Sequence, residues 1–146
     1  MPHLQFSRTV PFTPAQMLAL VGDLKAYPDF VPNCSHMELS AEEGSPLSFC
    51  DARMHVKFGP INQSYTSKVS IDRTAMSVIA TSTENPFDYL DSSWVFSPRE
   101  TGCAIKFEID FSFSNRLIAA VAEPAFANIQ GEILDAFIAE AKRRYA

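Results

Sequence analysis

Glycine is scarce in this chain of 146 residues, which contains only five, and they form no glycine-rich loop. Nucleotide-binding enzymes use such loops to bring backbone N–H groups close to phosphates. No serine, histidine and aspartate residues are arranged in the pattern of a hydrolase site. The sequence therefore argues against a nucleotide enzyme or a hydrolase, and we expect no catalytic residue.

Cysteine is also rare, with three residues and no Cys-x-x-Cys pair. An odd number of cysteines without such a motif is typical of a reduced protein. The first residues do not form a charged segment followed by an apolar signal core. The longest apolar run near the C-terminus, residues 117–122, is far shorter than the roughly 20 residues that cross a bilayer. We expect a cytoplasmic protein whose membrane contact, if any, is peripheral at the inner membrane.

Basic residues number 12 against 17 acidic residues, which gives a formal net charge of -5. A negative field does not attract nucleic acid, so DNA is not an expected partner. His3, His36 and His55 lack the spacing of metal ligands, so we expect neither a metal site nor a required cofactor. Residues 142–144 form a basic cluster, but cations at the end of a helix also balance the helix dipole.

Aromatic residues are abundant, with twelve phenylalanines, four tyrosines and one tryptophan. From residue 35 to residue 113, apolar and polar side chains alternate with a period of two, which predicts antiparallel strands. Turn signals divide this stretch into six strands, at residues 43–46, 59–60, 72–74, 85–86 and 97–102. A further strand over about residues 4–10 brings the predicted sheet to about seven strands.

Helical signals flank this stretch on both sides. Thr13-Pro14-Ala15-Gln16 is a capping box with proline in the first turn, which predicts a helix over about residues 14–21, and residues 23–27 add a further turn. Helical periodicity returns from about residue 115 to 145, with a kink expected at Pro124. Its apolar side is expected to comprise Ile118, Val121, Ala125, Ile129, Ile133 and Phe137. This order predicts one α+β domain, residues 1–146, with a curved sheet wrapped around the last helix.

Residues 27–34 read Tyr-Pro-Asp-Phe-Val-Pro-Asn-Cys and predict a stiff loop. Proline disfavours the helical conformation of the residue before it, so Tyr27 and Val31 are expected to be extended or in turns. Asp29 could be a general acid, but a solvated turn carboxylate is the simpler interpretation. The apolar residues Tyr27, Phe30 and Val31 must pack either against the protein's own core or against an apolar ligand.

The order of elements resembles the helix-grip fold of START-like proteins. Residues 27–34, the stretch from Asn85 through Trp94 to Phe96, the strand at residues 107–113 and the C-terminal helix resemble the coenzyme Q-binding and bacterial ribosome-association toxin family. This family often carries the label polyketide cyclase/dehydrase. It usually has tryptophan before the loop cysteine, where this chain has Asn33. The spacing of tyrosine, prolines, phenylalanine and cysteine in residues 27–34 carries most of this resemblance.

The resemblance implies non-enzymatic binding of ubiquinone or a similar isoprenoid lipid in an apolar cavity between sheet and helix. Such a protein would support respiratory electron transport as a carrier or chaperone, with the loop as a lid. Gln63, Tyr65 and Ser67 would either meet a quinone oxygen or form hydrogen bonds within the sheet. The expected ligand-binding residues are Tyr27, Phe30, Val31, Met54, Val56, Phe58, Tyr65, Trp94, Phe107, Phe111, Ile129 and Ile133.

Two alternatives belong to other classes of protein. The toxin relatives implied by the resemblance bind the large ribosomal subunit and inhibit translation, although the acidic balance of this chain weakens that hypothesis. A polyketide cyclase or dehydratase would agree with the family label, but the inward-facing positions hold hardly any acids or bases.

Overall fold

The computed structural model describes residues 3–42, 47–58 and 61–145. For residues 41, 42, 58 and 61 it describes the backbone but not the side chain. The turn signals at residues 43–46 and 59–60 also lie outside the described residues. The elements in chain order are β1 (His3–Val10), α1 (Pro14–Val21), the 3-10 helix η1 (Leu24–Ala26), α2 (Tyr27–Phe30), β2 (Cys34–Glu42), β3 (Leu47–Phe58), β4 (Ile61–Asp72), β5 (Ser77–Ser82), β6 (Phe87–Arg99), β7 (Gly102–Phe113) and α3 (Arg116–Tyr145).

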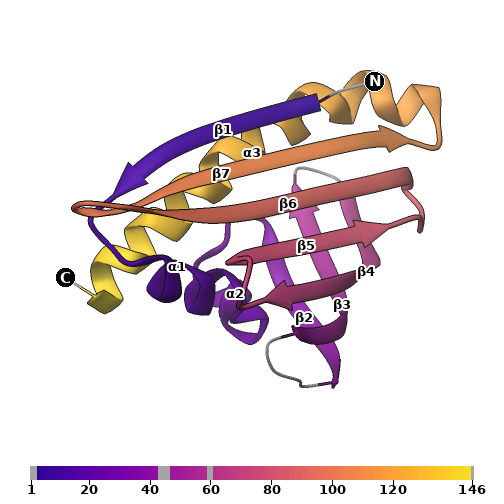
Figure 1. Cartoon of the computed structure of the whole chain (residues 1–146). Coiled ribbons are helices and arrows are strands. Elements are labelled where there is room, and N and C mark those ends of the chain that lie inside the picture. The colour runs from indigo at the N-terminus through magenta and orange to yellow at the C-terminus, as the bar shows by residue number, and fades with distance from the viewer. Residues whose placement is uncertain (1–2, 43–46, 59–60, 146) are drawn as a thin grey trace.

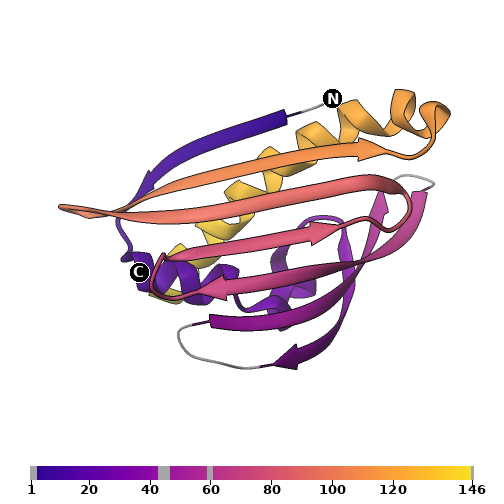
Figure 2. The same cartoon turned by 45° about the vertical axis from the view of Figure 1, so that its right-hand side comes forward.

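The strands form one antiparallel sheet of seven strands in the order β1-β7-β6-β5-β4-β3-β2. From β2 to β7 each strand pairs with the next one in the chain, and β1 closes the order by pairing with β7. The sheet curves so that α3 runs across its inner face, while α1 and α2 lie at one end (Figures 1 and 2). The helix-grip architecture expected from the sequence is confirmed.

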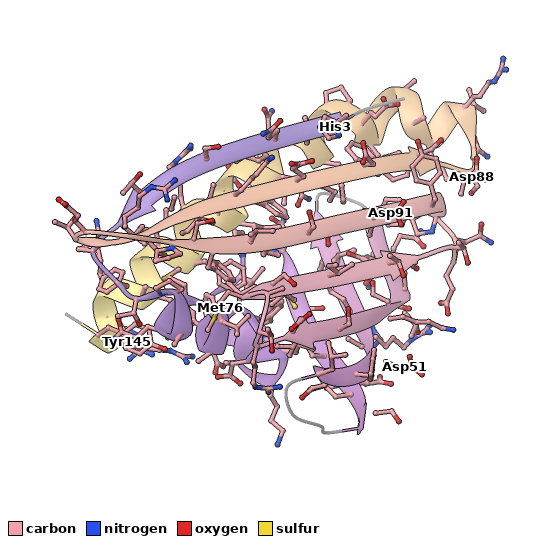
Figure 3. The ribbon with its side chains drawn as sticks, viewed as in Figure 1. His3, Asp51, Met76, Asp88, Asp91 and Tyr145 are labelled. Carbon is pink, nitrogen blue, oxygen red and sulfur yellow. The ribbon has the colours of Figure 1, made fainter. Side chains whose placement is uncertain are left out.

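Alternation along each strand separates an inner face from an outer face. In β7 the residues that point inward are Cys103, Ile105, Phe107, Ile109, Phe111 and Phe113, all of them buried. Asp51 and Asp91 belong to one cross-strand row on the opposite face, where both are exposed (Figure 3). One buried and one solvated face is the pattern that fixes the register of an antiparallel sheet.

Helix α1 begins as its sequence predicts. The Thr13 hydroxyl accepts a hydrogen bond from the Gln16 backbone N–H at 3.1 Å, and the Gln16 side chain accepts one from the Thr13 N–H at 2.9 Å. These two bonds satisfy N–H groups that have no partner inside the helix. The helix buries Met17, Leu18, Leu20 and Val21 in the core.

The expectation for Tyr27 is wrong. Its φ and ψ angles are -53° and -43°, so it opens the short helix α2, whereas Val31 is extended as expected with angles of -78° and 123°. The buried Tyr27 hydroxyl donates a hydrogen bond to the Val21 carbonyl, and its ring meets the Phe137 ring edge-on at 5.2 Å. These tertiary contacts hold the helical backbone at Tyr27. The following Pro28 stands at the start of α2, where its missing N–H costs no helical bond.

Helix α3 is a single helix of 30 residues that contains Pro124, and the kink expected there stays a prediction. Its buried side, however, differs from the expected one. Ile118 and Val121 are 39% and 73% exposed. Phe137 is buried as expected, and the other residues that α3 buries are Ala122, Phe126, Gln130, Leu134, Glu140 and Ala141. Relative to the expected line, the buried line is shifted by about one residue along most of the helix. A hydrophobicity pattern does not select it, because small and polar residues occupy some of its positions.

Ion pairs and hydrogen bonds hold the last turns of α3 against the N-terminal helices. Arg143 and Arg144 both bond the buried Glu140 carboxylate, at 2.5 Å and 2.8 Å. Arg144 also reaches Asp23 at 3.2 Å, and the Tyr145 hydroxyl donates to the Gln16 carbonyl at 3.2 Å (Figure 3). The paired arginines hold the pKa of Glu140 at about 2, well below the usual value for glutamate.

Candidate ligand-binding cavity

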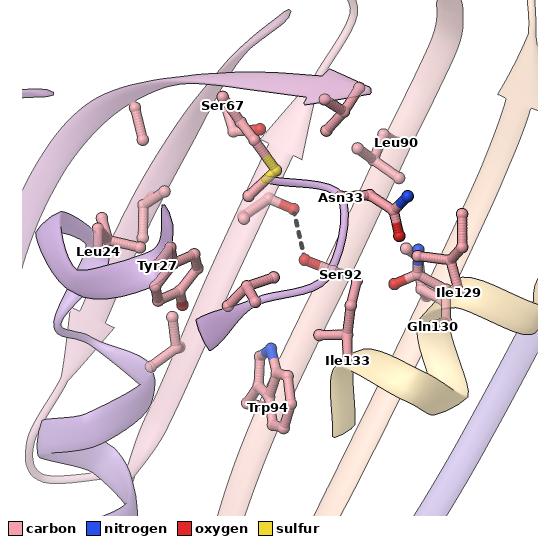
Figure 4. Close-up of a pocket in the computed structure, with 18 of the residues that line it drawn as sticks. Leu24, Tyr27, Asn33, Ser67, Leu90, Ser92, Trp94, Ile129, Gln130 and Ile133 are labelled. Atoms are coloured by element: carbon pink, nitrogen blue, oxygen red, sulfur yellow. Dashed lines mark hydrogen bonds between the residues drawn. The ribbon is translucent and has the colours of Figure 1, made fainter. Parts of the chain in front are cut away.

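A cavity of about 140 Å³ lies between the inner face of the sheet and α3, next to α2 and the segment that follows it. Strands β2 to β7 contribute one wall and α3 contributes the other. Tyr27 lies at one side of the cavity, and Asn33 and Gln130 lie at the other (Figure 4). The curved sheet therefore leaves space where it does not close fully on the helix.

Aromatic rings form a continuous part of the wall. The Trp94 and Phe107 rings, on neighbouring strands, stack with their centroids 4.2 Å apart and their planes inclined by 19°. The Phe137 ring from α3 meets Trp94 edge-on at 5.1 Å. All three line the cavity. A flat apolar group entering the cavity would thus face ring surfaces from both the sheet and the helix.

Most of the expected ligand-binding residues line this cavity. They are Tyr27, Val31, Met54, Val56, Tyr65, Trp94, Phe107, Ile129 and Ile133. Phe58 lies at the end of β3, but its side chain is outside the described residues.

Phe30 and Phe111 do not line the cavity. The Phe30 ring packs edge-on against Phe137 at 5.2 Å, and the Arg144 guanidinium lies 5.8 Å from its centroid. Phe111 is fully buried and packs against Phe126 at 4.6 Å. Of Tyr27, Phe30 and Val31, the first and the last therefore reach the cavity, as does Pro32, while Phe30 closes the end of the core.

Several lining residues were not expected from the sequence. The alternation of the strands already placed some of them on the inner face, and these are Met37, Ala52, Val69, Val78, Ala80, Leu90 and Ile109. On α3, Phe126 and Gln130 became apparent only from the position of the helix. Their spacing of four residues, continued by Leu134, is a signal that a search for a helical face could use.

Polar groups in the wall are few, and no charged residue is among the described lining residues. Ser92 donates to the Ala80 carbonyl at 3.5 Å (Figure 4). The Tyr65 hydroxyl donates to the Met54 sulfur at 3.6 Å, and the Asn33 side-chain N–H donates to the Lys57 carbonyl at 2.9 Å. The Tyr27 hydroxyl bonds the Val21 carbonyl, and three further polar groups of the wall, Ser67, Gln130 and the indole N–H of Trp94, have no hydrogen-bond partner among the described residues.

Gln63, which was considered for contact with a quinone oxygen, is exposed and does not line the cavity. Tyr65 and Ser67 do line the cavity. Tyr65 was expected either to meet a quinone oxygen or to form a hydrogen bond within the sheet. Its bond to Met54 joins two neighbouring strands and agrees with the second expectation.

The ionisable groups near the cavity are poor proton donors and nucleophiles. Burial raises the pKa of both Tyr27 and Tyr65 above the usual value for tyrosine, so both phenols stay protonated at neutral pH. Burial also raises the pKa of the Cys34 thiol to about 11, which suppresses its reactive thiolate form. Asp29, the one carboxylate of the segment 27–34, is exposed. The cavity is thus suited to holding an apolar molecule.

The histidines lie outside the cavity. His36 and His55 are neighbours on β2 and β3, with ring centroids 5.3 Å apart, and His55 bonds Glu38 at 3.0 Å. His3 bonds Asp110 at 2.5 Å. No group of three or more ligating side chains with the arrangement of a metal site occurs in the part of the chain that the structure describes. Within the same residues, no helix combines the length and apolar character needed to cross a membrane.

A curved antiparallel sheet that grips a long helix around an apolar cavity defines a START-like, helix-grip domain. The chain belongs to the family described as polyketide cyclase / dehydrase and lipid transport, whose model matches residues 10–138.

Relatives and solved structures agree with this assignment. The ribosome association toxin RatA of Vibrio cholerae serotype O1 is 31% identical over 150 residues, covering 99% of each chain. The mitochondrial coenzyme Q-binding protein coq10 of Schizosaccharomyces pombe is 24% identical over 141 residues, covering 95% of this chain and 86% of that one. The solution structure of an 18 kDa protein from Caulobacter crescentus superposes with a TM-score of 0.80 at 28% identity, covering 98% and 97% of the two chains.

Proposed function

We propose that this protein binds ubiquinone or a similar isoprenoid lipid and supports respiratory electron transport as a carrier or chaperone. The observation that carries the proposal is the aromatic and aliphatic cavity between sheet and helix, which has no charged side chain among its described lining residues. Apolar pockets with a few polar groups are typical sites for such ligands. The similarity to a coenzyme Q-binding protein favours a quinone among them.

The size of the cavity indicates how such a ligand would fit. Its volume of about 140 Å³ is close to that of the engineered cavity of ~150 Å³ that holds benzene. It therefore suits about one ring, and ring substituents and most of a long isoprenoid tail would have to extend beyond it. Each tail methylene that is buried contributes about 0.8 kcal/mol, so a few isoprene units offset the association cost and give roughly micromolar affinity.

The proposal is for binding without catalysis, although the family also bears the name of cyclases and dehydrases. A cyclase needs a group that donates or removes a proton close to the substrate. In the described wall the only titratable side chains are those of Tyr27 and Tyr65, and burial raises the pKa of both. This supports a carrier or chaperone over an enzyme.

A carrier of a membrane lipid needs contact with a bilayer, and we place that contact at the start of α3. Leu117 and Val121, one turn apart, are 80% and 73% exposed, and the first turn contains no acidic residue. Apolar side chains of this kind on a helix end favour peripheral insertion. Replacing both by serine should abolish cosedimentation with vesicles while the melting temperature is kept.

Fluorescence of Trp94 tests the ligand proposal, because it is the single tryptophan of the chain and lines the cavity. Ubiquinones of increasing tail length should quench it in a saturable way, with affinity rising with the first isoprene units. Quenching that is linear in concentration and independent of tail length would contradict binding in the cavity.

Ribosome association is the second candidate, and relatives named as ribosome association toxins favour it. The structure of the C-terminal basic cluster weighs against it, since Arg143 and Arg144 already bond Glu140. Sedimentation of the protein with ribosomes through a sucrose gradient at physiological salt separates the two functions. Comigration with the large subunit would support the toxin function, and its absence would remove it.

A further inference from the structure

Gln130 is the most deeply placed polar side chain of α3 in the cavity wall. It is 5% exposed and lies on the line of buried residues that includes Phe126 and Leu134. Its side chain lines the cavity between sheet and helix (Figure 4). An apolar residue at this position would continue the apolar surface of the helix without interruption.

The Gln130 amide has no hydrogen-bond partner among the described residues. Every described side-chain nitrogen or oxygen that is completely enclosed by protein does have a partner, so the Gln130 amide must keep some accessible surface. The two observations agree if the amide faces the cavity itself. A primary amide carries two N–H donors and one carbonyl acceptor, and a polar group buried without partners is costly. The amide is therefore placed to bond something that occupies the cavity.

Asn33 adds a second amide on the same side of the cavity (Figure 4). Its backbone has a φ of 68°, a conformation that asparagine tolerates well, and its side-chain N–H donates to the Lys57 carbonyl at 2.9 Å. That bond orients the Asn33 side chain and leaves its carbonyl oxygen as an acceptor. On the other side of the cavity lie Leu24 and Tyr27, whose hydroxyl is already engaged by Val21.

We infer that Gln130 binds the oxygen of the ligand's ring, with its side-chain N–H donating to a carbonyl, and that Asn33 supports the same polar end. This inference rests on the proposed function and narrows it to molecules that carry a carbonyl or hydroxyl on an apolar ring. The ring then packs along Trp94 and Phe107, and the hydrocarbon remainder binds without polar contacts. A purely hydrocarbon ligand would leave the Gln130 amide unpaired.

Replacing Gln130 by leucine tests the inference, since the two side chains are close in volume and leucine suits a helix. The control is Asn128→Leu, which removes an amide from an exposed position of the same helix. The probes are ubiquinone with two isoprene units and geranylbenzene, which keeps the ring and a matching tail but lacks oxygen. Calorimetry measures both affinities, and a thermal melt without ligand measures stability.

For Gln130→Leu we expect quinone affinity to fall about 10- to 100-fold, as sites built to bond a polar group lose that bond. Affinity for geranylbenzene should stay within about 2-fold or rise, and the melting temperature without ligand should rise because an unpaired buried amide is removed. Asn128→Leu should change neither affinity.

Quinone affinity of Gln130→Leu within about 2-fold of the wild type would overturn the inference and indicate that the amide bonds only water. An equal loss of affinity for both probes, or a lower melting temperature without ligand, would overturn it too, because the amide would then stabilise the fold and not the ligand. If the wild-type protein binds neither probe, the proposed function itself fails. If the wild type binds quinone and Gln130→Leu binds it equally well, the proposed function stands and only the role of Gln130 is refuted.

Discussion

Replacing Ala80 by leucine should stabilise the protein and abolish quinone binding at the same time. Ala80 is half-buried on the inner face of β5 and lines the cavity. Empty volume costs about 24 cal/mol per Å³, so complete filling of the 140 Å³ cavity would recover at most about 3 kcal/mol. A leucine fills part of it, and we expect a gain of about 1 kcal/mol, which corresponds to ~2–4 °C in melting temperature.

Thermal melts and quinone titrations followed by Trp94 fluorescence measure the two effects of Ala80→Leu. Thr81→Leu is the matched control, because it adds a leucine at the next, exposed position on the outer face of the same strand. This control should keep wild-type affinity. Unchanged quinone affinity in Ala80→Leu would refute the cavity as the binding site, and a lower melting temperature would refute the reasoning that the space beside Ala80 is free.

Three further predictions concern the helix and the core. Glu140→Gln should lower the free energy of unfolding by about 1–3 kcal/mol at pH 6. Because the pKa of Glu140 is about 2 in the folded protein, below its unfolded value, the difference between wild type and variant should shrink as the pH falls from 4.5 towards 2. Urea denaturation at a series of pH values measures this difference. Ile129→Asp should abolish quinone uptake by placing a charge in the cavity wall, with the melting temperature measured beside binding to separate loss of affinity from unfolding. Phe111→Ala should cost about 3–5 kcal/mol in free energy of unfolding, and refolded protein should still bind quinone because Phe111 lies outside the cavity; lost binding by folded protein would contradict that placement.

The sheet was predictable from the sequence because the alternation of its strands is strong. In β7 every second residue is buried, from Cys103 to Phe113. One-sided burial leaves a single register that keeps these side chains inside, so element order and alternation were enough to predict the helix-grip fold. Strand alternation likewise predicted cavity residues such as Val56 and Trp94, which point towards α3.

The rotation of α3 could not be predicted in the same way. Its apolar residues are spread widely around the helix, and the expected face included Val121, which is 73% exposed. Packing against the curved sheet selects the line through Phe126 and Gln130 instead. A polar residue on the buried line goes against a hydrophobicity pattern, and such departures concentrate where a protein binds something.

The segment 27–34 shows the limit of local rules. Pro28 disfavours a helical Tyr27, but the buried contacts of the Tyr27 ring and hydroxyl outweigh that local preference. Phe30 and Val31 are near neighbours with different roles, since one packs on Phe137 and the other lines the cavity. Which side chain faces the space depends on how α2 sits on α3, and no short sequence motif encodes that.

Mass spectrometry of the apolar ligand carried through purification is the most direct test of the central claim. Protein extracted with organic solvent, either as purified or after incubation with quinones, should yield a prenylquinone in stoichiometric amount, and Ala80→Leu protein treated identically should yield little. Wild-type protein that neither retains nor acquires an apolar ligand would contradict the account.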